Sequence, residues 1–512
     1  MQQRRLGILQ RFVSGKADSG RKLLRFLRKV ISVLFKFFYW FVPIVIGLLL
    51  LWIVGGHLLA SQMEKPVEQA WERFSRQFPK TETNTSAMKV EELAANLGLN
   101  FVFESSTTPT RKIHIPASKT KVWKEFDGIR KELNTYLDVQ LAKPNDEIDP
   151  PPEKLRNYLV THATDLELLS TYVLNSEPPH WGFDITLWDL AYPLPAFLST
   201  ADFQKILALD MLEKTRQGKT QEALKILDVS WRLNQVLLAR PSFIAQLVST
   251  IVLRYQLIAM RKMQGVPAAW TEQIERFVYK ARQAFSTSLE AESFMIFLTL
   301  NKYSISKIFF DKELAEELGF ETSFTIPRWL GWAIDPVLKP WFRIFTVDYF
   351  EQMQRSIHEF IQPDFCSANF TTFEKQYKFK SHWWNSILIN LFLKNSASFE
   401  VLTEDLFPPD QWNKLNRRIL QLELTQKVLQ AKSIAAQQGS FPQKIPGIET
   451  SICRDAKWRY KVAKDGTMSL SFDKQKDLDW LKPQSPGDLL TYYAKWKLPR
   501  SIATNTLSSH SR

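Results

Sequence analysis

The sequence is poor in glycine, and this shortage disfavours several classes of fold. Only 17 of the 512 residues are glycine, about half the usual share of ~7%. Phosphate-binding loops and tight β-hairpins depend on the positive φ angles that glycine adopts readily. Because 45% of the residues are hydrophobic, the chain can build a packed core, which excludes disorder as its main state. We therefore expect a mainly α fold.

Motifs of common catalytic and cofactor sites are missing from the sequence. None of the seven histidines belongs to an H-E-x-x-H motif, and no G-x-S-x-G motif occurs. Residues 218–220 match the end of a phosphate-binding loop, but Glu213 stands where that loop needs its first glycine. Asp477 and Asp479 form a D-x-D, which resembles the metal-binding motif of lumenal glycosyltransferases; such acid pairs are also common on solvated loops. We predict no catalytic residue, no cofactor and no metal site.

Acidic residues are nearly absent from the first 36 positions. This segment contains ten Lys or Arg and a single acid, Asp18, so it carries +9 of the net charge of +14. The rest of the chain is close to balanced and has no cluster of Lys and Arg of the kind that binds phosphate backbones. The charge distribution therefore argues against nucleic acid as a partner.

Charged residues are also absent from Phe37 to Met63, a stretch of 27 positions. A helix of this length exceeds the ~30 Å hydrocarbon core of a bilayer. Tyr39 and Trp40 lie at its start, where aromatic residues favour the headgroup zone. The apolar run is too long for the core of a cleaved signal peptide. We predict one transmembrane helix.

The orientation of this helix follows from its flanking charges. The positive-inside rule places the basic N-terminus in the cytoplasm and everything after Met63 on the other side. For a bacterial protein this means the inner membrane with a periplasmic body. Two N-glycosylation sequons, at Asn84 and Asn369, keep a eukaryotic secretory compartment open as the alternative.

The basic segment has a helical amphipathic pattern of its own. Apolar residues recur at helical spacing between positions 23 and 34, and basic residues fill the other face: Arg21, Lys22, Arg25, Arg28 and Lys29. Such a helix is expected to lie on the anionic inner leaflet, which makes the membrane a partner. The alternative is that these charges only set the topology.

The chain is expected to divide into six segments. They are a basic cytoplasmic segment (1–36), a transmembrane helix (37–63), a juxtamembrane helix with a linker and a small mixed region (64–149), a helical body (150–415), a helix plus β-hairpin module (416–500) and a disordered tail (501–512).

Two segments resemble known families. The turn QGKTQEALKIL, within residues 209–238, is similar to that of a tetratricopeptide repeat, with Gly218 ending one helix and the small Ala223 allowing close packing in the next. The resemblance implies a repeat-like α-α array for the body.

At the C-terminal end, Trp458, Tyr460 and Val462 alternate with polar residues before an Asp-Gly turn, which predicts a β-hairpin.

The hairpin belongs to a longer pattern. A helix, the sequence GSFP, a loop and the hairpin follow one another over about 418–472, and this order resembles the soluble part of type II secretion pseudopilins. The resemblance favours a bacterial envelope and a small α+β module. The pilin cleavage motif is missing, so filament assembly is not implied.

Two features could define sites outside the membrane. Cys366 and Cys453 are the only cysteines, and an oxidising compartment would permit their pairing; two buried free thiols are the alternative. Four tryptophans in proline-punctuated segments could line a groove for a glycan or peptide, although aromatic residues also fill seams between packed helices. They are Trp181, Trp188, Trp329 and Trp332.

These observations predict a single-pass, membrane-anchored helical scaffold or binding protein of the cell envelope, with another envelope protein as its partner. The alternative is an envelope enzyme, a hydrolase or glycosyltransferase acting on cell-wall glycan or peptide. An enzyme would bring carboxylates together at the bottom of an aromatic cleft, whereas a scaffold would leave them on solvated faces. The oligomeric state is left open.

Overall fold

The computed structural model describes residues 2–99, 119–187, 197–302, 328–360, 366, 409–475, 481 and 488–496. Within these residues the chain forms eleven α-helices and one three-stranded antiparallel sheet, which confirms the mainly α fold. The predicted tail, Trp188 and the acids at 477 and 479 lie outside the described residues.

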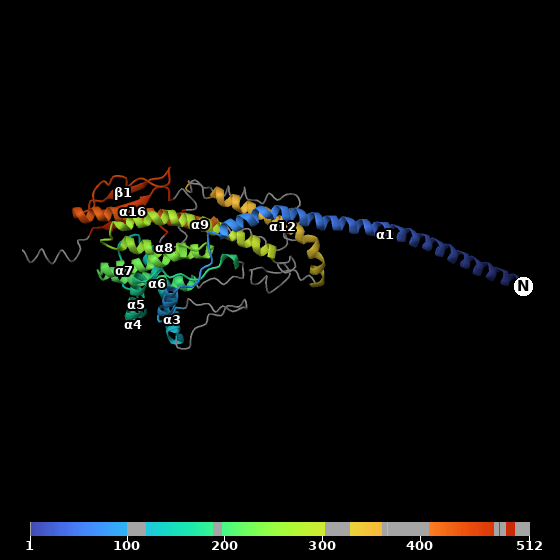
Figure 1. Cartoon of the computed structure of the whole chain (residues 1–512), viewed down its shortest axis with the longest axis horizontal. Coiled ribbons are helices and arrows are strands. Elements are labelled where there is room, and N and C mark those ends of the chain that lie inside the picture. The colour runs from blue at the N-terminus through green and yellow to red at the C-terminus, as the bar shows by residue number, and fades with distance from the viewer. Residues whose placement is uncertain are drawn as a thin grey trace, which may run out of the picture. The chain divides into compact units, whose positions relative to one another are not determined.

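The chain divides into two compact units. The first contains residues 1–69, 303–317 and 322–347, and the second contains 70–302, 318–321 and 348–512. Two long helices contribute residues to both units: α1 (Gln2–Ser75) and α12 (Arg328–Phe360). Figure 1 shows α1 as the long blue helix at the N-terminal end of the chain.

Helix α1 contains the predicted apolar span. From Tyr39 to Ser75 it is long and apolar enough to cross a membrane, and only 6% of its most apolar 18-residue stretch is buried. Helix α8 (Phe243–Lys262) is also long and apolar enough to cross a membrane, but 67% of its most apolar 18-residue stretch is buried inside the protein. Such burial is typical of the core helix of a folded domain. A single N-terminal candidate span therefore remains in the described part of the chain.

The second unit is a helical body followed by a small sheet. Its helices before α12 are α2 (Thr85–Ala95), α3 (Thr120–Ala142), α4 (Glu153–Thr161), α5 (Ala163–Asn175), α6 (Phe197–Arg216), α7 (Thr220–Leu238), α8 and α9 (Ala269–Lys302), with a short 3-10 turn, η2 (Ile185–Leu187). Helix α8 packs against α6, α7, α9 and α16 (Pro409–Gln438). A helix with so many packed neighbours is apolar over most of its surface, which explains why the composition of α8 resembles that of a membrane span.

Helices α6 and α7 form the helical hairpin that the sequence predicts around Gly218. This glycine has a φ of +77° and lies two positions before the first residue of α7. Ala223 is fully buried in the core of the hairpin. A polar network ties the pair to α8, because Ser230 of α7 donates to Gln204 of α6 and accepts from Gln256 of α8 (2.5 and 2.8 Å). Fully paired buried groups of this kind fix the register of packed helices.

The predicted β-hairpin is present at the C-terminal end. Strand β1 (Trp458–Val462) pairs antiparallel with β2 (Thr467–Phe472), so that Trp458 lies opposite Phe472. Gly466 supplies the turn with a φ of +79°. A third strand, β3 (Thr491–Lys495), pairs with β2 on its other edge; this strand was not predicted from the sequence.

The sheet and α16 are attached to the helical body through buried polar contacts. The ammonium group of Lys432 in α16 donates to the carboxylate of Asp146 (2.6 Å), and the hydroxyl of Tyr492 in β3 donates to the same carboxylate (2.5 Å). Lys262, at the end of α8, donates to the carbonyl oxygens of Asn145 and Glu147 (2.7 and 2.9 Å). The loop between α3 and α4 is therefore held by both parts of the second unit.

Candidate functional site

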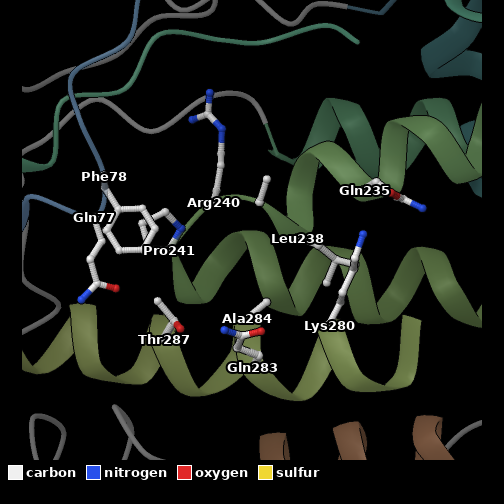
Figure 2. A pocket seen from close by; sticks show the side chains of 11 residues that line it. Gln77, Phe78, Gln235, Leu238, Arg240, Pro241, Lys280, Gln283, Ala284 and Thr287 are labelled. Carbon is white, nitrogen blue, oxygen red and sulfur yellow. The ribbon is translucent and has the colours of Figure 1, made fainter. Parts of the chain in front are cut away.

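A pocket of about 490 Å³ opens in the second unit where three segments meet. Figure 2 shows that its lining residues come from the chain just after α1, from the end of α7 with the loop that follows, and from one side of α9. The lining residues are Gln77, Phe78, Gln235, Leu238, Ala239, Arg240, Pro241, Lys280, Gln283, Ala284 and Thr287.

Helical spacing explains how α9 contributes to the pocket. Residues 283, 284 and 287 follow Lys280 by three, four and seven positions, so all four share one face of the helix. On the opposite side, the Arg240 guanidinium donates to the carbonyl oxygen of Trp181 (2.6 Å) and lies 5.8 Å from the ring centre of Phe183. Figure 2 shows this guanidinium turned away from Phe78 and Thr287, so its role is to fix the loop that forms the wall.

Two further hollows adjoin the pocket along α9. One, of about 570 Å³, includes Asp228, Trp231 and Arg232, and the other lies around Glu275. Lys280 lines all three hollows. We call this continuous hollowed surface the α9 surface.

The electrostatics of the first pocket favour binding of electron-rich groups. Its lining residues include the ammonium group of Lys280 and three side-chain amides, but no carboxylate. Ammonium and amide N–H groups donate to carbonyl and carboxylate oxygens. The lining residues also lack a nucleophile next to a base, which acyl or glycosyl transfer would need.

The adjoining hollow has a more mixed character. Arg232 donates to the carbonyl oxygens of Val173 and Leu174 (3.0 and 2.7 Å), which lie in the last turn of α5. Burial raises the pKa of the Asp228 carboxyl above its ordinary value, and the nearby Arg232 opposes this shift. The indole nitrogen of Trp231 is buried without a hydrogen-bond partner. No group of three or more His, Cys, Asp or Glu side chains that could hold a metal ion occurs among the described residues.

The four tryptophans of the predicted aromatic groove fall in different parts of the chain. Trp181 is half-buried in the second unit, and its indole nitrogen donates to the carboxylate of Glu91 (2.7 Å). Trp329 and Trp332 belong to α12 in the first unit, but their side chains, like all of Trp188, lie outside the described residues. The groove stays a prediction. Trp181 does contribute indirectly to the α9 surface, because its carbonyl oxygen holds Arg240.

The basic residues predicted to contact the inner leaflet lie on α1. Arg21, Lys22, Arg25, Arg28 and Lys29 are all in helical conformation, whereas their side chains lie outside the described ones. Their interaction with lipid stays a prediction.

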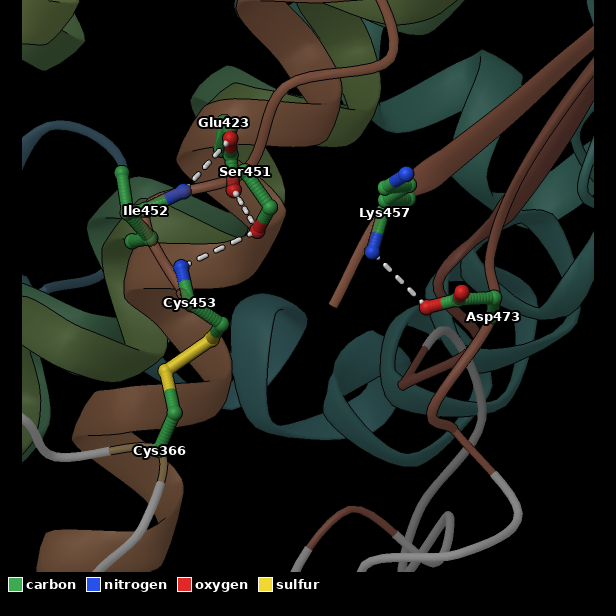
Figure 3. Close-up of a disulfide and its surroundings, with 7 residues drawn as sticks. All are labelled: Cys366, Glu423, Ser451, Ile452, Cys453, Lys457 and Asp473. Carbon is green, nitrogen blue, oxygen red and sulfur yellow. Dashed lines mark hydrogen bonds between the residues drawn. A yellow bond between two sulfur atoms is a disulfide. The ribbon is translucent and has the colours of Figure 1, made fainter. Parts of the chain in front are cut away.

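The two cysteines are joined in the structure. Cys366 and Cys453 form a disulfide with a Cα–Cα distance of 5.6 Å (Figure 3). The loop around Cys453 is also attached to α16, since the backbone N–H of Ile452 and the hydroxyl of Ser451 both donate to the carboxylate of Glu423 (3.1 and 3.3 Å). Burial raises the pKa of the Glu423 carboxyl. The disulfide thus fastens residue 366 to the module that contains the sheet.

Sequence reasoning missed the α9 surface because its residues come from three distant segments. The one available signal was the spacing of polar residues along α9, which is equally typical of a solvated helix face. Comparison with known proteins adds no function, since no protein-family model, curated protein or solved structure matches the chain.

Proposed function

We propose that this protein is a membrane-anchored binding or scaffold protein whose helical body lies outside the cytoplasm, on the periplasmic side of a bacterial inner membrane. The observation that carries the proposal is the composition of α1. A cationic segment is followed directly by an exposed apolar stretch, and the same helix then continues into residues of the folded second unit. A cationic flank of this kind stays on the cytoplasmic side.

The disulfide supports the compartment. Disulfides persist in the periplasm and other oxidising compartments, and they are rare in the cytosol. Cys453 is 2% exposed and is bonded to a residue 87 positions away, so the bond links distant parts of the second unit.

The α9 surface supports a binding role. Its hollows of about 490 and 570 Å³ fall in the usual size range of ligand pockets. Donors around Lys280 suit an extended polar segment of another envelope protein, because main-chain carbonyl groups and carboxylates accept hydrogen bonds from them. A body of repeat-like α-α pairs beyond α6 and α7 remains part of this proposal.

Reporter fusions to the full chain test the topology. Alkaline phosphatase fused after Arg512 should be active, and green fluorescent protein at the same place should be dark, because the first folds outside the cytoplasm and the second inside it. The same two reporters fused before Met1 should give the opposite pattern. Activity of the cytosolic reporter alone at the C-terminal end would refute the proposal.

Photo-crosslinking in intact membranes tests the binding role. A photoreactive residue at Gln283 should trap a defined protein, and Lys280→Glu should abolish the adduct. The same label at Leu168, which is 53% exposed on α5 and is not among the residues that line the three hollows, serves as the control. An equal adduct from Leu168, or turnover of cell-wall fragments by the purified full-length protein, would contradict a scaffold role.

A further inference from the structure

Within the first unit, residues 337–343 of α12 pack along the apolar stretch of α1. The indole nitrogen of Trp52 donates to the main-chain carbonyl oxygen of Val337 (3.3 Å). The rings of Trp52 and Trp341 lie 4.3 Å apart between their centres. A residue in the middle of the candidate span is therefore in direct contact with a segment almost 300 positions later.

Gly56 lets the two helices approach closely. A Cβ atom added at Gly56 would lie 2.9 Å from the Cβ of Pro340 and 3.0 Å from the indole nitrogen of Trp341, whereas one added at Gly47 or Gly55 would meet nothing within 4 Å. Small residues at such points are typical of helix pairs in membranes. The contact is thus specific to one side of α1.

An ion pair marks the end of the apolar stretch. The Arg343 guanidinium makes two hydrogen bonds to the carboxylate of Glu64, one of them from Nε at 2.7 Å, and a third to Nδ1 of His57 at 3.2 Å. Glu64 is only 4% exposed. Charged residues close to a hydrocarbon core are expected to be paired in this way.

The contacts also define the direction and depth of α12. Val337 meets Trp52, Pro340 meets Gly56, and Arg343 meets Glu64, so the two helices run the same way. At a rise of 1.5 Å per residue, Trp52 lies about 16 Å before Met63, which is half of a ~30 Å hydrocarbon core. If α1 spans the bilayer, residues 337–343 of α12 lie within the same layer.

We propose that α12, over residues 335–345, is a second membrane-embedded element that docks on the C-terminal half of the α1 span and contacts the lipids of the leaflet facing the body. The inference rests on the proposed function, because it needs α1 to be in the membrane. Prolines 336 and 340 are compatible with it, since prolines are tolerated in membrane helices that have neighbours. The segment also contains Asp335 and Lys339, which are four positions apart on one helix face and interact as opposite charges, as charges at this depth require. The partner of this surface is the lipid acyl chains and headgroups.

Depth-dependent fluorescence quenching tests the proposal on the full chain. The protein carries one environment-sensitive label at Leu338→Cys, at Leu51→Cys in the α1 span or at Val160→Cys on α4, which is 77% exposed. It is reconstituted in phosphatidylcholine and phosphatidylglycerol vesicles with or without brominated acyl chains. Labelling without reductant leaves the native disulfide unreactive.

We expect the labels at positions 338 and 51 to lose most of their emission with brominated lipid, and the label at 160 to keep it. Quenching at 51 without quenching at 338 would overturn this inference and leave the proposed anchor intact. Absence of quenching at 51 would overturn both.

Matched glycine variants test the docking itself. Gly56→Leu should displace α12 and change the quenching of the label at 338, because its side chain meets Pro340 and Trp341. Gly55→Leu adds the same apolar side chain where nothing lies within 4 Å, so quenching at 338 should stay as in the parent protein. Equal effects of the two variants, or no effect of either, would refute the docking.

Discussion

Substitution of Asp488 provides a direct test of how the C-terminal module is stabilised. Its carboxylate accepts hydrogen bonds from the guanidinium groups of Arg417 and Arg418 in α16, both at 3.0 Å. The three side chains are almost completely buried, with exposed fractions of 2%, 1% and 8%. Burial lowers the pKa of Arg418 to about 10, and the nearby Asp488 charge opposes this shift. Asp488→Asn therefore removes the negative charge shared by two buried cations.

The expected loss of stability in Asp488→Asn follows from this geometry. Removing one partner of a buried ion pair typically costs about 3–5 kcal/mol, because the remaining charge is left uncompensated. At 1.4 kcal/mol per factor of ten, amide hydrogen exchange in β1 and β2 should accelerate by roughly two to three and a half orders of magnitude. Mass spectrometry of the full-length protein in detergent micelles measures this change.

A matched control separates burial from charge. Asp465 faces Lys495 at 4.0 Å, but both side chains are 61% exposed, and exposed pairs of this kind often contribute nothing measurable. Asp465→Asn keeps the side-chain oxygen that accepts from the Thr467 N–H, so sheet exchange should be unchanged. Equal exchange rates in Asp488→Asn and Asp465→Asn would refute the reasoning.

Three further predictions concern the second unit. Cys453→Ser removes a link between residues 87 positions apart and should lower the free energy of unfolding by about 4–5 kcal/mol in the loop-entropy view. Urea-dependent proteolysis measures this change, and an unchanged urea midpoint would contradict the linkage. Burial raises the pKa of Glu292 to about 7, so the folded state holds a proton that the unfolded state loses above pH 4.5, and stability should fall from pH 4.5 to 7. Glu292→Gln keeps the acceptor for the Phe243 N–H and should gain roughly 3 kcal/mol over the parent at pH 8 and little at pH 4.5; the same gain at both values would exclude titration of this group. Gly218→Ala, at a φ of +77°, should lower the melting temperature, whereas Gly128→Ala, inside α3 with free space around it, should raise it.

Local patterns in the sequence predicted local structure well. Alternation from Trp458 and the Asp-Gly turn specified the hairpin, because side chains alternate along a strand whatever it packs against. Gly218 predicted the end of α6, because helices commonly end at a glycine with a positive φ. The apolar length of α1 is visible in the sequence itself, as 27 consecutive uncharged residues from Phe37 to Met63. Each of these signals lies within about 30 residues.

Features that depend on distant residues were not predictable. Strand β3 is five residues long and is defined by its pairing with β2. The α9 surface joins Phe78 to Lys280, and no spacing rule relates positions 200 residues apart. The contact of Trp52 with Val337 spans 285 positions. An aromatic segment such as the start of α12 looks the same in a sequence whether it lines a groove or packs on another helix.

Helix α16 shows why composition alone misjudges burial. It has four basic residues that are less than 9% exposed, namely Arg417, Arg418, Lys427 and Lys432, although a helix rich in such residues is normally solvated. Lys427 pairs with Glu423 of the same helix, but the other three have partners in other segments. Asp488, which pairs with both arginines, follows the hairpin, and Asp146, which pairs with Lys432, lies between α3 and α4. A buried charge is tolerated only when such a partner is in place. Correct burial of α16 therefore requires the sheet module and the helical body to assemble on it together, which is the physical reason for treating them as one unit.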